Sequence, residues 1–404
     1  MSCQSPTESE NLLHRILREQ HGGFSDILDH PEAYDLQIIY TKIDRDSAQG
    51  VHFNSFLYGM DSSNYFYPAS TVKFPIALLA MEKLNQSGME EVHLSTTMLT
   101  DSNRESQSTV LVDRSSANGF PSIGNYVRKV FLVSDNDASN RLYEFVGQEP
   151  LNKRLDALGF GNSKVTHRLS AFLSKEEDRY TNPVRFVDSA GAVIYSQPEA
   201  YSIYSFPEGS ERHLKGKGYM YGDSLVSEPK DFGQSNEMPL ADLHEMLQRV
   251  IFPEAFDESQ RFALTEEDYR FLYKAMGQVP HESVHPPYSG DAYYDGYCKF
   301  FLFGDSHENI PEHIRIYNKV GMAYGYLIDN AYIIDTKNGV EFMLSAVISV
   351  NKNGIYNDDQ YEYDAVGFPF LAHLGRVLYT YELERKRAVR PDFGRFTVID
   401  YKGE

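Results

Sequence analysis

Ser70 and Lys73 have the residue types and the spacing of a nucleophile with its own base. They stand three residues apart, directly before the apolar run Ile76–Met81, which indicates that a buried helix begins here. On one helix face the lysine amine can reach the serine hydroxyl. The N–H groups at a helix start also favour the anion formed when a serine attacks a carbonyl. An ordinary N-terminal helix serine is the alternative interpretation.

Two further short motifs lie on elements that suit this chemistry. Ser134-Asp135-Asn136 falls between two expected helices, and Lys319-Val320-Gly321 falls at the end of an expected strand that leads into a hairpin. Each motif is short enough to recur elsewhere in the chain. Their order along the chain, and the element on which each one falls, are more specific than any one of them alone.

With these three motifs the chain resembles the serine β-lactamase and penicillin-binding protein superfamily, and most closely the class A-like β-lactamases. That family carries Ser-x-x-Lys, Ser-Asp-Asn and Lys-Thr-Gly on the same kinds of element. The resemblance implies that Ser70 attacks the substrate and that Lys73 accepts its proton. Ser134 would relay a proton to the leaving nitrogen. Asn136 would hold Lys73 and the substrate, and Lys319 would supply positive charge.

The resemblance also implies supporting roles. The backbone N–H groups of Ser70 and Met322 would form the oxyanion hole, Asp135 would support its loop, and Gly321 would belong to the third motif. The sequence departs from the family at Val320, where a threonine or serine hydroxyl would bind the substrate carboxylate. No arginine lies between residues 316 and 350 to replace that hydroxyl.

A second departure concerns the glutamate that activates water in class A enzymes, within a Glu-x-x-Leu-Asn motif. That motif is absent, and counting along the chain places Leu173 at the position of the glutamate. Glu176 and Glu177 follow shortly and could act as the base only if the loop is rebuilt. As solvated loop acids they need no function.

The expected elements predict an α+β fold. Strands at 36–43, 51–58, 314–320, 325–335 and 340–350 would form an antiparallel sheet flanked by N- and C-terminal helices, with an inserted all-helical lobe. A helix is also predicted over 183–196. The domain prediction is a tether (1–10), a sheet lobe (11–62 with 312–404) and a helical lobe (63–311) with a long insertion around 197–310.

The composition of the chain limits the classes of partner that it can bind. The 38 basic and 58 acidic residues give a formal charge of −20, which argues against binding to nucleic acid or an anionic membrane. The polar stretch after Cys3 is typical of a bacterial lipoprotein start, with a chance cysteine as the alternative. His281 and His285 lie among prolines, which disfavours a zinc helix, so neither a metal nor a cofactor is expected.

These observations predict an exported cell-envelope serine hydrolase that forms an acyl-enzyme on Ser70 and hydrolyses β-lactam amides. The small-molecule substrate would be a β-lactam or an envelope peptide. Two alternatives stay open. One is a peptidase, transacylase or esterase of the penicillin-binding type, and the other is a non-catalytic binding module on the same fold.

Overall fold

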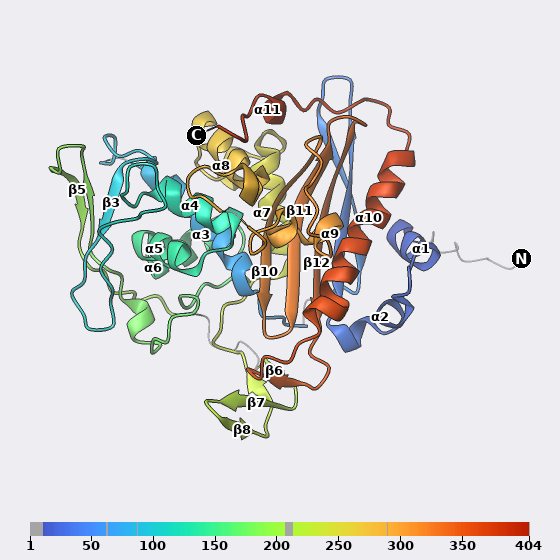
Figure 1. Cartoon of the computed structure of the whole chain (residues 1–404), viewed down its shortest axis with the longest axis horizontal. Coiled ribbons are helices and arrows are strands. Elements are labelled where there is room, and N and C mark those ends of the chain that lie inside the picture. The colour runs from blue at the N-terminus through green and yellow to red at the C-terminus, as the bar shows by residue number, and fades with distance from the viewer. Residues whose placement is uncertain (1–10, 62–63, 87, 207–212, 289, 404) are drawn as a thin grey trace, which may run out of the picture.

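A five-stranded antiparallel sheet built from both ends of the chain forms the centre of the protein (Figure 1). The structure is a computed structural model that describes residues 11–61, 64–86, 88–206, 213–288 and 290–403. The strand order is β10-β11-β12-β1-β2. These strands are β1 (Gln37–Arg45), β2 (Val51–Tyr58), β10 (Ile314–Ala323), β11 (Tyr326–Asp335) and β12 (Val340–Ser349).

The sheet separates two apolar cores because successive strand side chains point to opposite faces. In β11, Leu327 and Ile333 belong to one core, whereas their neighbours Ile328 and Tyr332 belong to the other. Every residue of β11 is buried, as expected for a central strand covered on both faces.

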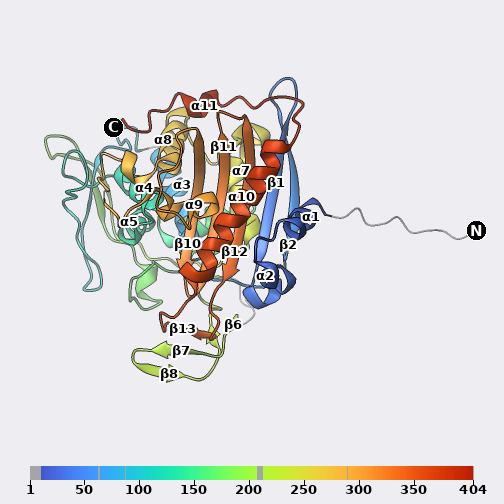
Figure 2. The same ribbon diagram turned by 45° about the vertical axis from the view of Figure 1, so that its right-hand side comes forward.

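Helices from distant parts of the chain cover these faces. On one side α10 (Phe368–Glu384) packs on β12 and on α1 (Leu12–Glu19), as Figure 2 shows. On the other side α7 (Leu240–Ile251) packs on β1, β11 and β12. The sequence predicted residues 197–310 as an insertion, but α7 within this range is a layer of the central core.

The helical lobe is built around α3 (Lys73–Leu84), of which nearly every residue is buried. A helix enclosed on all sides is expected to be apolar around its whole circumference, which explains its unbroken run of apolar residues. The helices α4 (Ile123–Leu132), α5 (Asn136–Val146) and α6 (Gln148–Ala157) belong to the same lobe, and α8 (Glu266–Gly277) packs between α4 and β10.

The α+β prediction is confirmed, but the helix predicted over 183–196 is wrong. This segment forms β4 (Val184–Val187) and β5 (Val193–Gln197), and β4 pairs with both β5 and β3 (Thr97–Thr100) in a small sheet of the helical lobe. The turn between them has a physical cause. Asp188 Oδ1 accepts from the N–H groups of Ala190 and Ala192, and Gly191 adopts a φ of 84° that favours glycine.

Short elements complete the described chain. Residues 214–231 form small strands below the sheet, at the end where β10 passes into β11 (Figure 1). In the described ranges, no helix is both long and apolar enough to cross a membrane. The short elements are α2 (Ser25–Asp29), β6 (Leu214–Lys215), β7 (Gly218–Tyr221), β8 (Ser224–Val226), β9 (Lys230–Asp231), α9 (Phe300–Phe303), β13 (Ile355–Tyr356) and α11 (Gly394–Thr397).

Candidate active site

Ser70 lies in a single 3₁₀ turn, Ala69–Val72, that continues directly into α3. Its hydroxyl is half-buried and has no hydrogen-bond partner among the described residues. The preceding Ala69 adopts a φ of 49°, a left-handed conformation that is costly for a residue with a Cβ. The backbone is therefore held in an unusual conformation directly before the candidate nucleophile.

The Lys73 amine lies one turn further on and joins the first motif to the second. Its Nζ donates to Asn136 Oδ1 at 2.6 Å and to the backbone carbonyl of Ser134, and it lies 3.4 Å from Ser134 Oγ. The Ser134 backbone is also left-handed, with a φ of 57°. The Ser-Asp-Asn loop thus presents one backbone oxygen and two side chains to a single amine.

Lys319, in β10 of the central sheet, brings the third motif into contact with the same side chains. Its Nζ donates to Ser134 Oγ at 2.8 Å and to the Val320 carbonyl at 2.8 Å. The Ser134 hydroxyl therefore lies between two lysines that are 246 positions apart in sequence. Residues from α3, the Ser134 loop, α5 and β10 meet here, as the three motifs predict.

Burial changes the charge state of both lysines. Desolvation, followed by the nearby charge of Lys319, holds the pKa of Lys73 well below its ordinary value. Burial lowers the pKa of Lys319 to about 8. Near neutral pH, an amine with a depressed pKa can accept a proton while a neighbouring ammonium keeps its charge.

Gly321 allows the sheet to approach the turn that carries Ser70. A Cβ on this glycine would lie 2.8 Å from the Pro68 carbonyl oxygen and 3.0 Å from Thr71 Cγ2. Both contacts are tighter than ordinary van der Waals packing, and one of them is with backbone. The glycine of the third motif is therefore explained by the contact between β10 and the 3₁₀ turn.

We expect Gly321→Ala to force β10 away from the Ser70 turn. Overpacking of this kind destabilises a protein by about 1–3 kcal/mol, which thermal unfolding would measure. Labelling of Ser70 by a fluorescent penicillin should slow by more than tenfold, because a displacement of about 1 Å is costly to a reacting geometry. Gly161→Ala is the control, because Gly161 is exposed and a Cβ there would make only an ordinary contact, 3.5 Å from Asp156 Oδ1. Labelling of Gly321→Ala at the normal rate would contradict this account of the contact.

The loop that carries Ser170, in the helical lobe, contacts the same side chains through Asn136. Asn136 Nδ2 donates to Ser170 Oγ at 2.8 Å. The loop is held there through its backbone, because Asn140 Oδ1 accepts from the Leu169 N–H at 3.0 Å and Asn140 Nδ2 donates to the Leu169 carbonyl at 2.9 Å. Asn136 and Asn140 lie four residues apart and so share one face of α5.

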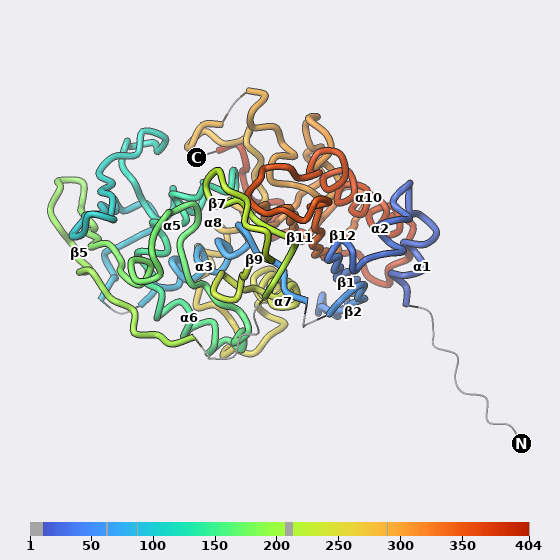
Figure 3. Tube along the Cα trace, turned by 90° about the horizontal axis from the view of Figure 1, so that it is seen from below, coloured from blue at the N-terminus to red at the C-terminus, as the bar shows by residue number. Residues whose placement is uncertain are grey.

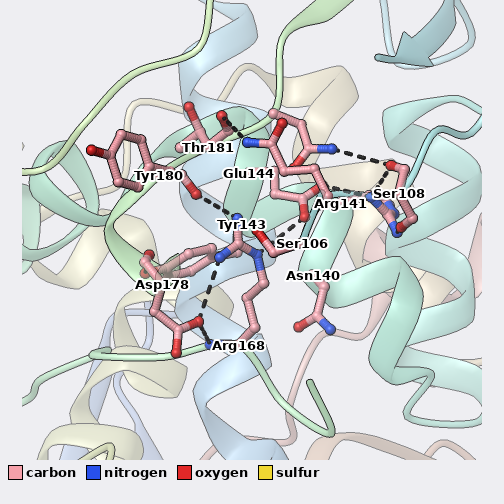
Figure 4. A network of polar contacts seen from close by, with 12 residues as sticks. Ser106, Ser108, Asn140, Arg141, Tyr143, Glu144, Arg168, Asp178, Tyr180 and Thr181 are labelled. Atoms are coloured by element: carbon pink, nitrogen blue, oxygen red, sulfur yellow. Dashed lines mark hydrogen bonds and ion pairs between the residues drawn. The ribbon is translucent and has the colours of Figure 1, made fainter. Parts of the chain in front are cut away.

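A buried ion-pair network fixes the start of the same loop (Figure 4). Arg168 contacts Glu144, one turn beyond Asn140 on α5, at 3.1 Å, and Asp178 at 3.4 Å. Arg141 pairs with the other oxygen of Glu144 at 2.9 Å. Such a network is costly to break, so the position of Ser170 is firmly set.

The loop acids proposed as bases lie away from this group. Glu177 is bound by Arg104 and Ser106, and these hydrogen bonds lower its pKa to about 2. Glu176 accepts from the Tyr201 hydroxyl at 3.3 Å. Leu173, the position reached by counting, lines a separate cavity of about 510 Å³. Within the described ranges, no carboxylate hydrogen-bonds to Lys73 or to Lys319.

Ser170 is therefore the residue that sequence counting missed. A signal was present, because Asn136, Asn140 and Glu144 repeat every four residues along α5 and could have marked the face that receives the loop. Their partners on the loop, however, cannot be read from spacing.

The remaining predicted residues have defined places. Asp135 caps α5, its Oδ1 accepting from the Ala138 N–H at 2.8 Å. Met322 lies half-exposed near the end of β10, and its oxyanion role stays a prediction. Val320 is buried in the apolar core shared with α10. Cys3 lies outside the described residues.

The described part of the chain holds no group of three or more His, Cys, Asp or Glu side chains arranged to bind a metal ion. His281 instead contacts Asp295 at 2.5 Å.

Comparison with known proteins gives one family match. Residues 45–207 match the model of the beta-lactamase enzyme family, a range that contains the first two motifs and Ser170. A comparison with curated proteins finds no match.

Solved structures give further likenesses. One is a beta-lactamase from Xanthomonas campestris pv. campestris (TM-score 0.48, 15% identity, covering 91% of this chain and 97% of that chain). Another is a beta-lactamase from Streptosporangium roseum (TM-score 0.47, 15% identity, covering 90% and 98%). A third is a beta-lactamase from Sphaerobacter thermophilus (TM-score 0.46, 12% identity, covering 90% and 97%). Over residues 45–207 the chain is thus similar to the beta-lactamase enzyme family, and its three motifs meet at one site.

Proposed function

We propose that this β-lactamase-like hydrolase reacts through an acyl-enzyme on Ser70. The observation that carries the proposal is the Ser134 hydroxyl lying between the Lys73 and Lys319 amines, with Asn136 holding Lys73. A chain of hydrogen-bond donors and acceptors of this kind can accept the proton of the attacking hydroxyl and deliver a proton to the leaving nitrogen of the amide.

The steps follow from these contacts. Ser70 Oγ attacks the carbonyl carbon of a β-lactam or a peptide amide, and its proton passes to the neutral Lys73 amine. The C–N bond then breaks, and the leaving nitrogen receives a proton through the Ser134 hydroxyl. Lys319 keeps a positive charge beside that hydroxyl and stabilises the negative charge that develops. Water finally hydrolyses the ester on Ser70.

We further propose that the last step is slow. Activation of water by a positioned general base contributes roughly 10²–10⁴-fold. Here the loop faces Asn136 with the Ser170 hydroxyl, which at neutral pH cannot take a proton as a carboxylate can. The acyl-enzyme should therefore persist, as expected for the penicillin-binding type of behaviour.

Covalent labelling tests this proposal. The protein is incubated with a fluorescent penicillin, and the adduct is located and timed by mass spectrometry. We expect one adduct on Ser70, formed within minutes and released over a much longer time. Ser70→Ala should give none, whereas Ser227→Ala, at another Ser-x-x-Lys sequence, should label normally. Absence of any adduct would overturn the proposal, and rapid turnover would overturn its second part.

The pH dependence of labelling gives a separate prediction. Lys73 must be neutral to accept a proton, so the rate should rise with pH through the depressed pKa of Lys73. Lys319 must be charged, so the rate should fall as pH rises through about 8. Lys319→Arg should remove the alkaline fall, because a guanidinium stays protonated throughout this range. A fall near pH 8 that persists in Lys319→Arg would assign it to another group, such as the buried Lys299, whose pKa burial also lowers to about 8.

We also propose, from the sequence alone, that the protein is exported to a bacterial cell envelope and carries a lipid on Cys3. Metabolic labelling with a fatty acid, compared between the natural protein and Cys3→Ala, tests this. Equal labelling of both proteins would contradict the anchor.

A further inference from the structure

Lys230 is a cation surrounded by aromatic rings instead of carboxylates. Its ammonium lies 5.1 Å from the centre of the Tyr219 ring, 5.4 Å from that of Phe232 and 5.5 Å from that of Tyr324. No ion pair of Lys230 occurs among the described residues, and the side chain is half-buried. Burial lowers its pKa, which reflects a charge without a counter-charge.

The neighbouring strand shows that this arrangement is not a general property of the region. Lys215 in β6 lies directly opposite Lys230 in β9. The Lys215 ammonium is neutralised by Asp35 at 3.0 Å and also donates to Asn64 at 2.6 Å. Lys230 has no such carboxylate partner among the described residues, so its partly desolvated charge has a cost. A cation kept at such a cost suggests an anionic ligand.

The rings connect Lys230 with the candidate active site. Tyr324 begins the turn after β10, two residues beyond Met322. Its ring lies 5.0 Å from that of Tyr67, which precedes Ser70 by three residues. The Tyr67 ring in turn stacks against His167 at 6.5 Å, at the start of the loop that carries Ser170. In the view from below, the segment with β7 and β9 lies on the near side of the molecule, below the central sheet (Figure 3).

The direction in which β10 runs through the site indicates which part of a bound substrate would lie near Lys230. Lys319 and Ser134 mark the leaving-nitrogen end, because Ser134 returns the proton there. Met322 marks the carbonyl in the proposed mechanism. Tyr324 is two residues beyond Met322, a backbone separation of at most about 7 Å, which puts it on the acyl side of the scissile bond.

We propose that Lys230 binds an anionic group on the acyl side of the substrate, with the rings of Tyr219 and Tyr324 packing beside it. This inference rests on the proposed function and adds its substrate class: amides whose acyl portion carries a carboxylate. The contact is a specificity contact, because Lys230 touches the substrate away from the bond that breaks. A hydrogen bond from a half-desolvated ammonium to a carboxylate is stronger than one between neutral groups.

Two penicillins that differ by one carboxylate test the inference. Benzylpenicillin and α-carboxybenzylpenicillin share the same ring system, and only the second carries an acid on its acyl side chain. The measurement is the ratio of their second-order rate constants for acylation of Ser70. We expect the natural protein to favour the carboxylated compound by roughly tenfold or more. Lys230→Met should reduce the ratio to near one, Lys230→Glu should invert it, and Lys230→Arg should keep it.

The control is Lys217→Met, which removes an exposed lysine between β6 and β7 and should leave the ratio unchanged. Thermal unfolding of each variant checks that the strands remain folded. Equal acylation by both penicillins in the natural protein, or a preference that survives in Lys230→Met, would overturn the inference and leave acylation of Ser70 intact. If neither penicillin labels Ser70, the proposed function itself fails and the inference fails with it.

Discussion

Lys73→Met should reduce the rate of Ser70 acylation by about 10³-fold. The substitution removes the amine that contacts Ser134 and Asn136 and keeps the apolar stem that fills the core of α3. Loss of a positioned proton acceptor costs roughly 10²–10⁴-fold in rate. The measurement is the second-order rate constant for labelling by a fluorescent penicillin, taken on protein shown by thermal unfolding to be folded.

Lys83 offers a matched control on the same helix. It too is a largely buried lysine, whose pKa burial lowers to about 8, and its amine donates to the Phe145 carbonyl at 2.5 Å and to Gln197 at 2.6 Å. Lys83→Met should cost stability, because it removes two hydrogen bonds and a cation–π contact with Phe145, but the folded protein should label at the normal rate. Equal losses of rate in the two variants would mean that Lys73 acts only through the fold.

Ser170→Glu should shorten the lifetime of the acyl-enzyme by about 100-fold or more. It places a carboxylate on the loop position that faces Asn136, where a base could take a proton from water. The release of the adduct from Ser70 is followed by mass spectrometry after excess penicillin has been removed. The rate of acylation should change far less than the rate of release.

Leu173→Glu is the sharpest comparison, because counting along the sequence places the family's glutamate there. In the structure Leu173 lines the cavity with Gln148 and Thr166, so a glutamate at this position should leave the release rate unchanged. Faster release in Leu173→Glu but not in Ser170→Glu would show that the loop follows a different path from the one described.

Much of the fold could be predicted because local patterns carry it. The alternation in residues 314–350 gave the strands β10, β11 and β12 with bounds close to those observed, and the apolar run after Ser70 gave α3. The prediction failed at 183–196, where the apolar residues fit either periodicity. There the pairing of β4 with β3, some ninety residues earlier, decides the structure.

The sequence by itself determined the three motifs, their order and the kind of element that carries each one. It did so because a helix start, a helix cap and a strand end depend on neighbouring residues. Only the tertiary structure decided that Ser170, and not Leu173 or Glu177, faces Asn136. The path of that loop is set by Asn140 holding Leu169 and by Arg168 reaching Glu144, contacts between residues more than twenty positions apart. Such contacts depend on how the chain returns on itself, which no local pattern records.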